Sequence, residues 1–130
     1  MALNVNDLLA TAVKRGASDL HLAVGVPPTL RIDGQLVPLS ENEALTSKAV
    51  ETLVTSIISP AQKEDFVNSR EFDFAYQVPG VGRFRINLHW ERGNTGMVAR
   101  SIPDRIPAMD EINMPEVCYK LARMDQGLIL

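Results

Sequence analysis

The chain has 130 residues, a length that corresponds to one domain. Hydrophobic residues make up 45% and charged residues 22%, a composition typical of a globular rather than a disordered protein. The net charge of -3 argues against general nucleic-acid binding, and a single cysteine excludes a disulfide framework or a zinc site built on cysteines. No apolar run reaches the ~18 residues of a membrane span, and the first residues lack the basic start of a secretory signal. We therefore expect a soluble, cytoplasmic domain.

The first half of the chain predicts a helix, a strand and a hairpin. Apolar side chains between residues 5 and 13 recur with the spacing of one buried helical face, with Asn4 as the expected N-cap and Gly16 as the stop. Residues 19–24 then alternate between polar and apolar side chains, as in a half-buried strand. Asp33-Gly34 favours a tight turn within a hairpin over residues 29–39.

Two further helices are predicted in the middle of the chain. The first has Thr46 or Ser47 as its cap and extends to about Ile57. The second begins at a capping box, with Ser59 as its cap and Pro60 at its first position.

The second half then changes to the period of strands. Alternating strands are predicted over residues 71–76, 83–90 and 97–102, with a turn between Gly93 and Gly96. A last helix is predicted from Pro115 to about Arg123, with two buried side chains, Val117 and Leu121. This order predicts an α+β fold with a largely antiparallel sheet covered by helices.

The last residues form an apolar run, Gly127–Leu130, typical of a buried strand. Because an exposed apolar strand promotes aggregation, we expect the chain to be part of a longer protein. The alternative is a terminal segment that packs into this domain's own core.

An arginine-rich segment is the sharpest functional signal. Residues 83–105 carry five arginines against two carboxylates, a local charge of +3, whereas residues 41–77 have a local charge of -4. The strand period places four polar side chains on one face: Arg83, Arg85, Asn87 and His89. Guanidinium groups suit bidentate recognition of phosphate, so one hypothesis is a phosphate-facing surface. The other is an ordinary solvated face of a sheet.

The remaining candidate groups indicate no catalytic centre. Asp19 and His21 share the polar face of the first strand, but no third metal ligand lies at a recognisable spacing. The thiol of Cys118 is expected to be packed or half-exposed rather than nucleophilic. The chain contains no phosphate-binding loop and no nucleophile elbow, and we expect no metal site in it.

Several motifs together resemble one protein family. The segments Ala17–Leu22, Gly25–Pro28 and Arg31–Gly34 are similar to the opening of secretion and pilus motor ATPases. Four further segments resemble a narrower group, the pilus retraction ATPases of the PilT family, which power twitching motility. These segments are Gly82–Asn87, Arg92-Gly93, Arg100–Pro103 and the tail Gly127–Leu130.

The resemblance implies a fold and a domain organisation. Residues 1–125 would form a PAS-like N-terminal domain, and residues 126–130 would be the first strand of a RecA-like ATPase domain that is missing here. The full-length protein would bind ATP and Mg, whereas this fragment would hold no cofactor and would not hydrolyse ATP.

The resemblance also implies partners and site residues. Six subunits would form a ring through the ATPase domains, and each N-terminal domain would bring arginines to a neighbour's nucleotide. Arg85 and Arg100 are then the trans-acting candidates, and Arg83 and Arg92 are weaker candidates for contact with the phosphates. Such a motor would be cytoplasmic, would lie at the inner membrane beside a pilus platform protein, and would neither bind nucleic acid nor span the membrane.

The competing interpretation is a free-standing PAS-like sensory or interaction module. Its arginine face would bind a small anion or an acidic partner. A gene that continues past Leu130 into a phosphate loop would favour the motor.

Overall fold

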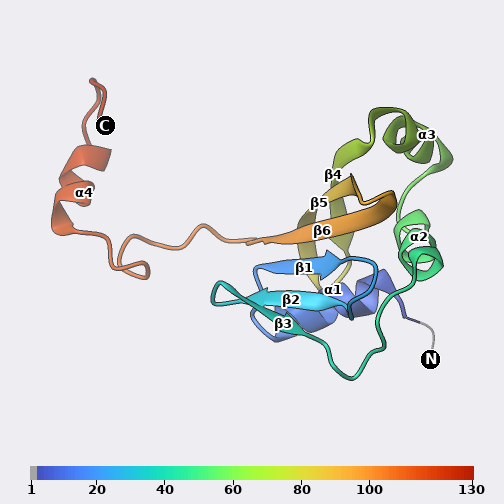
Figure 1. Cartoon of the computed structure of the whole chain (residues 1–130). Helices are drawn as coiled ribbons and strands as arrows, with labels where there is room; N and C mark the ends of the chain where they lie inside the picture. Colours follow the sequence, from blue (N-terminus) through green and yellow to red (C-terminus); the bar gives the residue numbers. More distant parts are fainter. Residues whose placement is uncertain (1–2) are drawn as a thin grey trace.

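Six strands form a single antiparallel sheet in the computed structural model, which describes residues 3–130 (Figure 1). The strands are β1 (Asp19–Leu22), β2 (Thr29–Ile32), β3 (Gln35–Pro38), β4 (Glu71–Val78), β5 (Gly82–Glu91) and β6 (Asn94–Ile102). Their order across the sheet is β3-β2-β1-β6-β5-β4, so β1 and β6 form the central pair. The predicted α+β class with an antiparallel sheet is confirmed.

Four helices accompany the sheet: α1 (Val5–Lys14), α2 (Ser47–Thr55), α3 (Pro60–Ser69) and α4 (Glu116–Ala122). The first three begin at the predicted caps. Asn4 and Thr46 accept hydrogen bonds from backbone amides of α1 and α2, and Ser59 and Gln62 form the capping box of α3. Within residues 3–130, no helix combines the length and the apolar character needed to cross a membrane.

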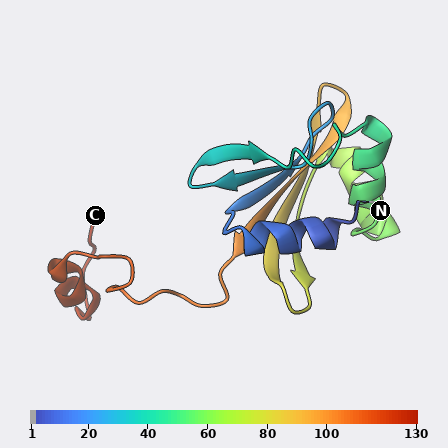
Figure 2. The same ribbon diagram turned by 90° about the horizontal axis from the view of Figure 1, so that it is seen from below.

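The core lies on one face of the sheet. Figure 2 shows α1 running across this face, with α2 and α3 near one end of β4–β6. Side chains of α1, α2 and α3 pack there against alternate residues of the strands. The strands supply Leu20, Leu22, Leu30, Phe84, Ile86, Leu88, Met97 and Ala99, each at most 1% exposed. Because strand side chains alternate, the polar residues between them lie on the opposite face.

Two of the three hairpin turns, β2–β3 and β5–β6, use two residues with positive φ. Asp33 and Gly34 form the predicted turn between β2 and β3, at φ 48° and 80°. The turn between β5 and β6 is formed by Arg92 and Gly93, at φ 50° and 79°. The prediction of a turn between Gly93 and Gly96 was therefore too late in the chain, because β6 already begins at Asn94.

The segment after Ile102 lies apart from the sheet. Both views place α4 at a distance from β1–β6 (Figures 1 and 2). The predicted burial of Val117 and Leu121 was wrong: Val117 is 54% exposed, Leu121 is half-exposed, and α4 has no buried residue. Residues 127–130 are not in a strand and are exposed in this structure, so their place in a RecA-like domain stays a prediction.

Candidate functional site

A row of charged side chains crosses four strands on the polar face of the sheet. Arg85 in β5 is the direct cross-strand neighbour of Arg100 in β6. Arg100 in turn lies opposite Asp19 in β1, and Asp19 lies opposite Arg31 in β2. We call these four residues the charged row. The topology therefore brings together side chains from residues 19 to 100 of the chain.

The structure places Arg100 on the polar face, although the sequence of β6 alone favours burial. The strand period groups Arg100 with Val98 and Ile102, two apolar residues that the sequence predicts in the core. Instead, the core side of β6 carries Met97 and Ala99, whereas Val98 and Ile102 are only half-buried. Arg100 therefore lies on the same face as Arg85.

Asp19 is the one buried charged residue among those that the structure describes, at 3% exposure. Its Oδ1 accepts a hydrogen bond from Arg100 Nε at 2.9 Å, and its Oδ2 accepts one from Ser18 Oγ at 2.8 Å. The Nε of Arg31 lies 3.6 Å from the same Oδ2. Burial raises the pKa of Asp19, but the hydrogen bonds from Ser18 and Arg100 and the charge of Arg100 outweigh it, so that the pKa lies below its ordinary value.

Arg85 and Arg100, which are direct neighbours across β5 and β6, are held in a similar way. Arg100 and Arg85 are each 71% exposed at the side chain, and each presents its Nε to a carboxylate. For Arg85 the partner is Asp73, with 3.7 Å between Nε and Oδ1. Among the residues that the structure describes, the Nη nitrogens of both arginines donate no hydrogen bond. Two guanidinium groups thus offer unused donors to solvent on the same face.

Arg85 and Arg100 line a hollow of about 440 Å³. Its lining includes Glu71, Asp73 and Asn87, and the Asn87 amide donates to both carboxylates at 3.3 Å. The site therefore has a basic side, formed by the arginines, and an acidic side on β4. Directly opposed like charges repel across a sheet, so the arginine pair favours anionic neighbours.

The structure separates the other two predicted arginines. Arg83 lies two residues before Arg85 on the same exposed side of β5, next to the charged row. Arg92 lies in the β5–β6 turn, which at the usual rise per residue is about 23 Å from Arg85. Arg85, Arg100 and Arg83 thus share one region, and Arg92 does not.

Both histidines also lie on the polar face. His21 pairs with Val98 across β1 and β6, and its Nε2 is buried with no hydrogen-bond partner among the described residues. Burial and the charge of Arg31 lower the pKa of His21, although Asp19 opposes the shift. His89 lies over Gly96, and its Nδ1 is 3.1 Å from Asn87 Oδ1. Within residues 3–130, no group of three or more histidine, cysteine or acidic side chains is placed to hold a metal.

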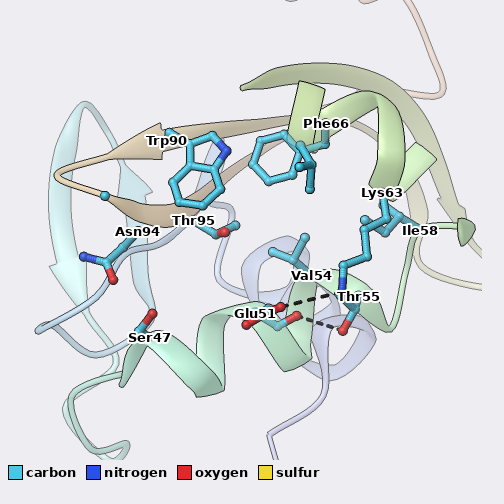
Figure 3. Close-up of a pocket in the computed structure, with 12 residues that line it drawn as sticks. Ser47, Glu51, Val54, Thr55, Ile58, Lys63, Phe66, Trp90, Asn94 and Thr95 are labelled. Carbon is cyan, nitrogen blue, oxygen red and sulfur yellow. Dashed lines mark hydrogen bonds and ion pairs between the residues drawn. The ribbon is translucent and has the colours of Figure 1, made fainter. Parts of the chain in front are cut away.

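A second hollow, of about 250 Å³, lies between α2, α3 and the β5–β6 hairpin (Figure 3). Phe66 and Trp90 stack along one side with 6.0 Å between ring centroids. Lys63, which is paired with Glu51 at 3.6 Å, is the one cation among its lining residues. This hollow therefore offers a single cation, whereas Arg85 and Arg100 place two guanidinium groups next to each other in the charged row.

The sequence alone missed Asp19 and Arg31 as parts of the site. Asp19 was interpreted as an ordinary polar residue of a strand face, and Arg31 only as part of a family motif. The signal was their alternation: Arg31 lies between two apolar residues of β2, and Asp19 begins β1, in which polar and apolar residues alternate. What the alternation does not reveal is that β1 pairs with β6, which brings Asp19 to Arg100.

Comparisons with known proteins identify relatives among type IV pilus ATPases. The chain is 38% identical over 128 residues to the type IV pilus retraction ATPase PilT of Pseudomonas aeruginosa. It is 35% identical over 123 residues to the type IV pilus ATPase PilU of the same organism. These matches cover 98% and 95% of this chain but 37% and 32% of the relatives, so the chain spans about a third of their length. No family model matches the chain.

Solved structures give a consistent result. A crystal structure of the pilus retraction motor PilT with bound ADP has a TM-score of 0.78 and 32% identity, covering 94% of this chain and 36% of that one. The ATPase DotB of Legionella pneumophila has a TM-score of 0.67 at 22% identity, covering 95% of this chain and 35% of its own, and shows a shared fold. The resemblance to pilus retraction ATPases that the sequence motifs indicate is thus confirmed.

Proposed function

We propose that this chain, a homologue of type IV pilus ATPases, is the N-terminal accessory domain of a hexameric motor ATPase that powers pilus retraction. In this proposal the domain packs on the ATPase domain of a neighbouring subunit, and Arg85 and Arg100 reach the nucleotide bound there. Arg83 contributes to the same electropositive region. The observation that carries the proposal is the direct pairing of two exposed arginines on the open face of the sheet.

The physical basis is the charge that develops during phosphoryl transfer. Positive groups stabilise this charge best when they are fixed in advance and when water is excluded around them. Arginines on a sheet satisfy the first condition, because strands hold their backbone rigidly. The second condition would be met when the polar face closes against a neighbouring subunit, so hydrolysis would be coupled to the position of this domain.

The rest of the proposal follows from the relatives. They are ATPases, and one structure holds ADP, so the full-length protein would bind ATP with Mg. Residues 126–130 would lead into the ATPase domain, which supplies the phosphate loop. The ring would act in the cytoplasm at the inner membrane, beside a pilus platform protein.

The first experiment measures ATP hydrolysis by the full-length protein after Arg85→Ala and Arg100→Ala. We expect each substitution to lower the rate by about 10-fold or more, because each removes a charge that acts in the transition state. Arg15→Ala is the matched control, since Arg15 pairs with Glu41 beyond the end of α1 and lies outside the charged row. Unchanged hydrolysis in both variants would overturn the proposal.

Mixed rings test whether the arginines act between subunits. Subunits that carry Arg85→Ala and Arg100→Ala are combined with subunits whose phosphate loop is disabled. If the arginines act on a neighbour's nucleotide, the mixture regains activity at those interfaces where an intact arginine pair meets an intact phosphate loop. If they act within their own subunit, no combination restores hydrolysis.

A further inference from the structure

We propose that Asp19 is the positioning residue of this arginine pair: it holds Arg100 by its Nε and thereby directs the Nη nitrogens of Arg100 toward an anion on the open face. The inference rests on the proposed function and assigns a role to a residue outside the arginine pair. It makes Asp19, together with Ser18, part of the structure that determines where the Arg100 charge lies.

The geometry of the contact carries the first step. Arg100 reaches Asp19 through Nε, at 2.9 Å from Oδ1, rather than through its terminal nitrogens. A guanidinium held at Nε keeps its terminal donors available for a second, bidentate partner. The side chain of Arg100 remains 71% exposed, while that of Asp19 is 3% exposed. A buried carboxylate therefore holds one nitrogen of an exposed cation on the neighbouring strand.

The second step is that Asp19 is itself fixed. Ser18 Oγ donates to Oδ2 at 2.8 Å, and Arg31 Nε lies 3.6 Å from the same oxygen. Arg31 is held from its other end as well, because its Nη1 donates to the Gly34 carbonyl at 3.1 Å. A carboxylate bound on both oxygens has little freedom to rotate, so it defines the orientation of the group bound to Oδ1.

The third step concerns repulsion between the two arginines. Arg85 and Arg100 are direct cross-strand neighbours, an arrangement that is unfavourable for like charges. A carboxylate lies on each outer side of the pair, Asp19 beside Arg100 and Asp73 beside Arg85. These contacts turn the two Nε groups away from each other and toward the flanking carboxylates. The Nη groups are then the donors that remain for a shared anion.

The 130-residue chain permits a direct test by nuclear magnetic resonance of the arginine Nε–H groups. We expect a slowly exchanging, shifted Arg100 Nε–H signal in the unaltered chain. This signal should move as the pH falls below 3.8 and Asp19 becomes protonated. Arg15, which contacts Glu41 through Nη2 rather than Nε, is the internal reference. An Arg100 signal that exchanges as fast as that of Arg15 and does not follow this titration would overturn the inference without any substitution.

The second test is a double-substitution cycle on ATP hydrolysis by the full-length protein. We expect Asp19→Asn to lower the rate about threefold or more, because a small displacement of a charged group is costly in a transition state. Added to Arg100→Ala, it should lower the rate no further, since Asp19 acts through Arg100. Asp65→Asn on α3 is the matched control, with unchanged hydrolysis. Melting temperatures of all variants separate loss of folding from loss of positioning.

The outcomes distinguish the two proposals. If Arg100→Ala lowers hydrolysis but Asp19→Asn does not, or if their effects multiply, the positioning role is wrong and the proposed function stands. If Arg85→Ala and Arg100→Ala both leave hydrolysis unchanged, the proposed function is wrong and the positioning role toward its nucleotide falls with it.

Discussion

The imidazole of His89 lies so close over Gly96 that a Cβ on Gly96 would be 2.5 Å from His89 Nε2. The two residues are direct partners across β5 and β6. We therefore expect Gly96→Ala to displace the His89 ring and to lower the free energy of unfolding by about 1–3 kcal/mol. Urea unfolding of the 130-residue chain, followed by the fluorescence of its single tryptophan, measures this change.

A second substitution shows whether the ring is the cause. His89→Ala removes the imidazole, so Gly96→Ala should cost little in that background. The coupling between the two substitutions should then exceed about 0.5 kcal/mol. Purely additive effects would mean that the glycine is required for another reason.

The stack of Phe66 on Trp90 predicts that two different substitutions of Phe66 lower the free energy of unfolding by different amounts. Phe66 is 4% exposed, so Phe66→Ala should lower the free energy of unfolding by about 3–5 kcal/mol. Phe66→Leu keeps much of the volume and should cost less than half as much. Both should shift the Trp90 emission to longer wavelength, because the indole loses its stacking partner. Val67→Ala, at a side chain that is 54% exposed, is the control with little effect on either quantity.

The lowered pKa of Asp19 predicts how the stability of the chain depends on acidity. A carboxyl whose pKa is lower in the folded than in the unfolded state stabilises the fold above its ordinary pKa of 3.8. This contribution is lost as the pH falls through the folded-state pKa. We expect Asp19→Asn to lower the free energy of unfolding by about 1–3 kcal/mol at pH 7, with a smaller difference from the unaltered chain at pH 3. A difference that does not change with pH would contradict the assignment.

His21 should affect stability in a higher pH range. Its pKa is lowered from 6.5 in the folded state, so the unfolded chain binds a proton more readily. The fold therefore loses stability as the pH falls below 6.5 toward the folded-state pKa. Melting temperatures at pH 7.5 and pH 5.5 should show a larger decrease for the unaltered chain than for His21→Gln. Equal decreases in melting temperature would mean that a group other than His21 causes the pH dependence.

The exposure of the C-terminal segment predicts that it contributes little to stability. A chain that ends at residue 107 keeps all six strands and loses α4, which has no buried residue. We expect its melting temperature to agree with that of the 130-residue chain within about 2 °C. A larger decrease would show that α4 packs on the sheet in solution.

Local patterns determined most of the fold. The caps at Asn4, Thr46 and Ser59 involve hydrogen bonds to residues two or three positions away, so the sequence contains all the necessary information. The same holds for the Asp33-Gly34 turn and for the alternation of Phe84, which is buried, with its polar neighbours. These interactions do not depend on distant parts of the chain.

The errors concern features that depend on distant contacts. Val117 and Leu121 have the spacing of a buried helical face, but burial requires a partner surface, and the described chain brings none to α4. Arg100 was expected among core residues because Val98 and Ile102 are apolar, although only the pairing with β1 and β5 decides which face is covered. The arginine pair was partly predictable, whereas its carboxylate partner was not.

The central position of the β1–β6 pair has a consequence for how the chain folds during synthesis. Residues 19–22 form their ladder with residues 97–100, so the middle of the sheet closes a loop of more than 70 residues. Each outer hairpin can form from neighbouring residues, but the pairing of β1 with β6, the seam between the two halves of the sheet, can form only after β6 has left the ribosome. Asp19 and Arg100 lie on that seam. A nascent chain that stops before residue 97 consequently has β1 without its inner neighbour, and the charged row on the polar face cannot form before β6 is available.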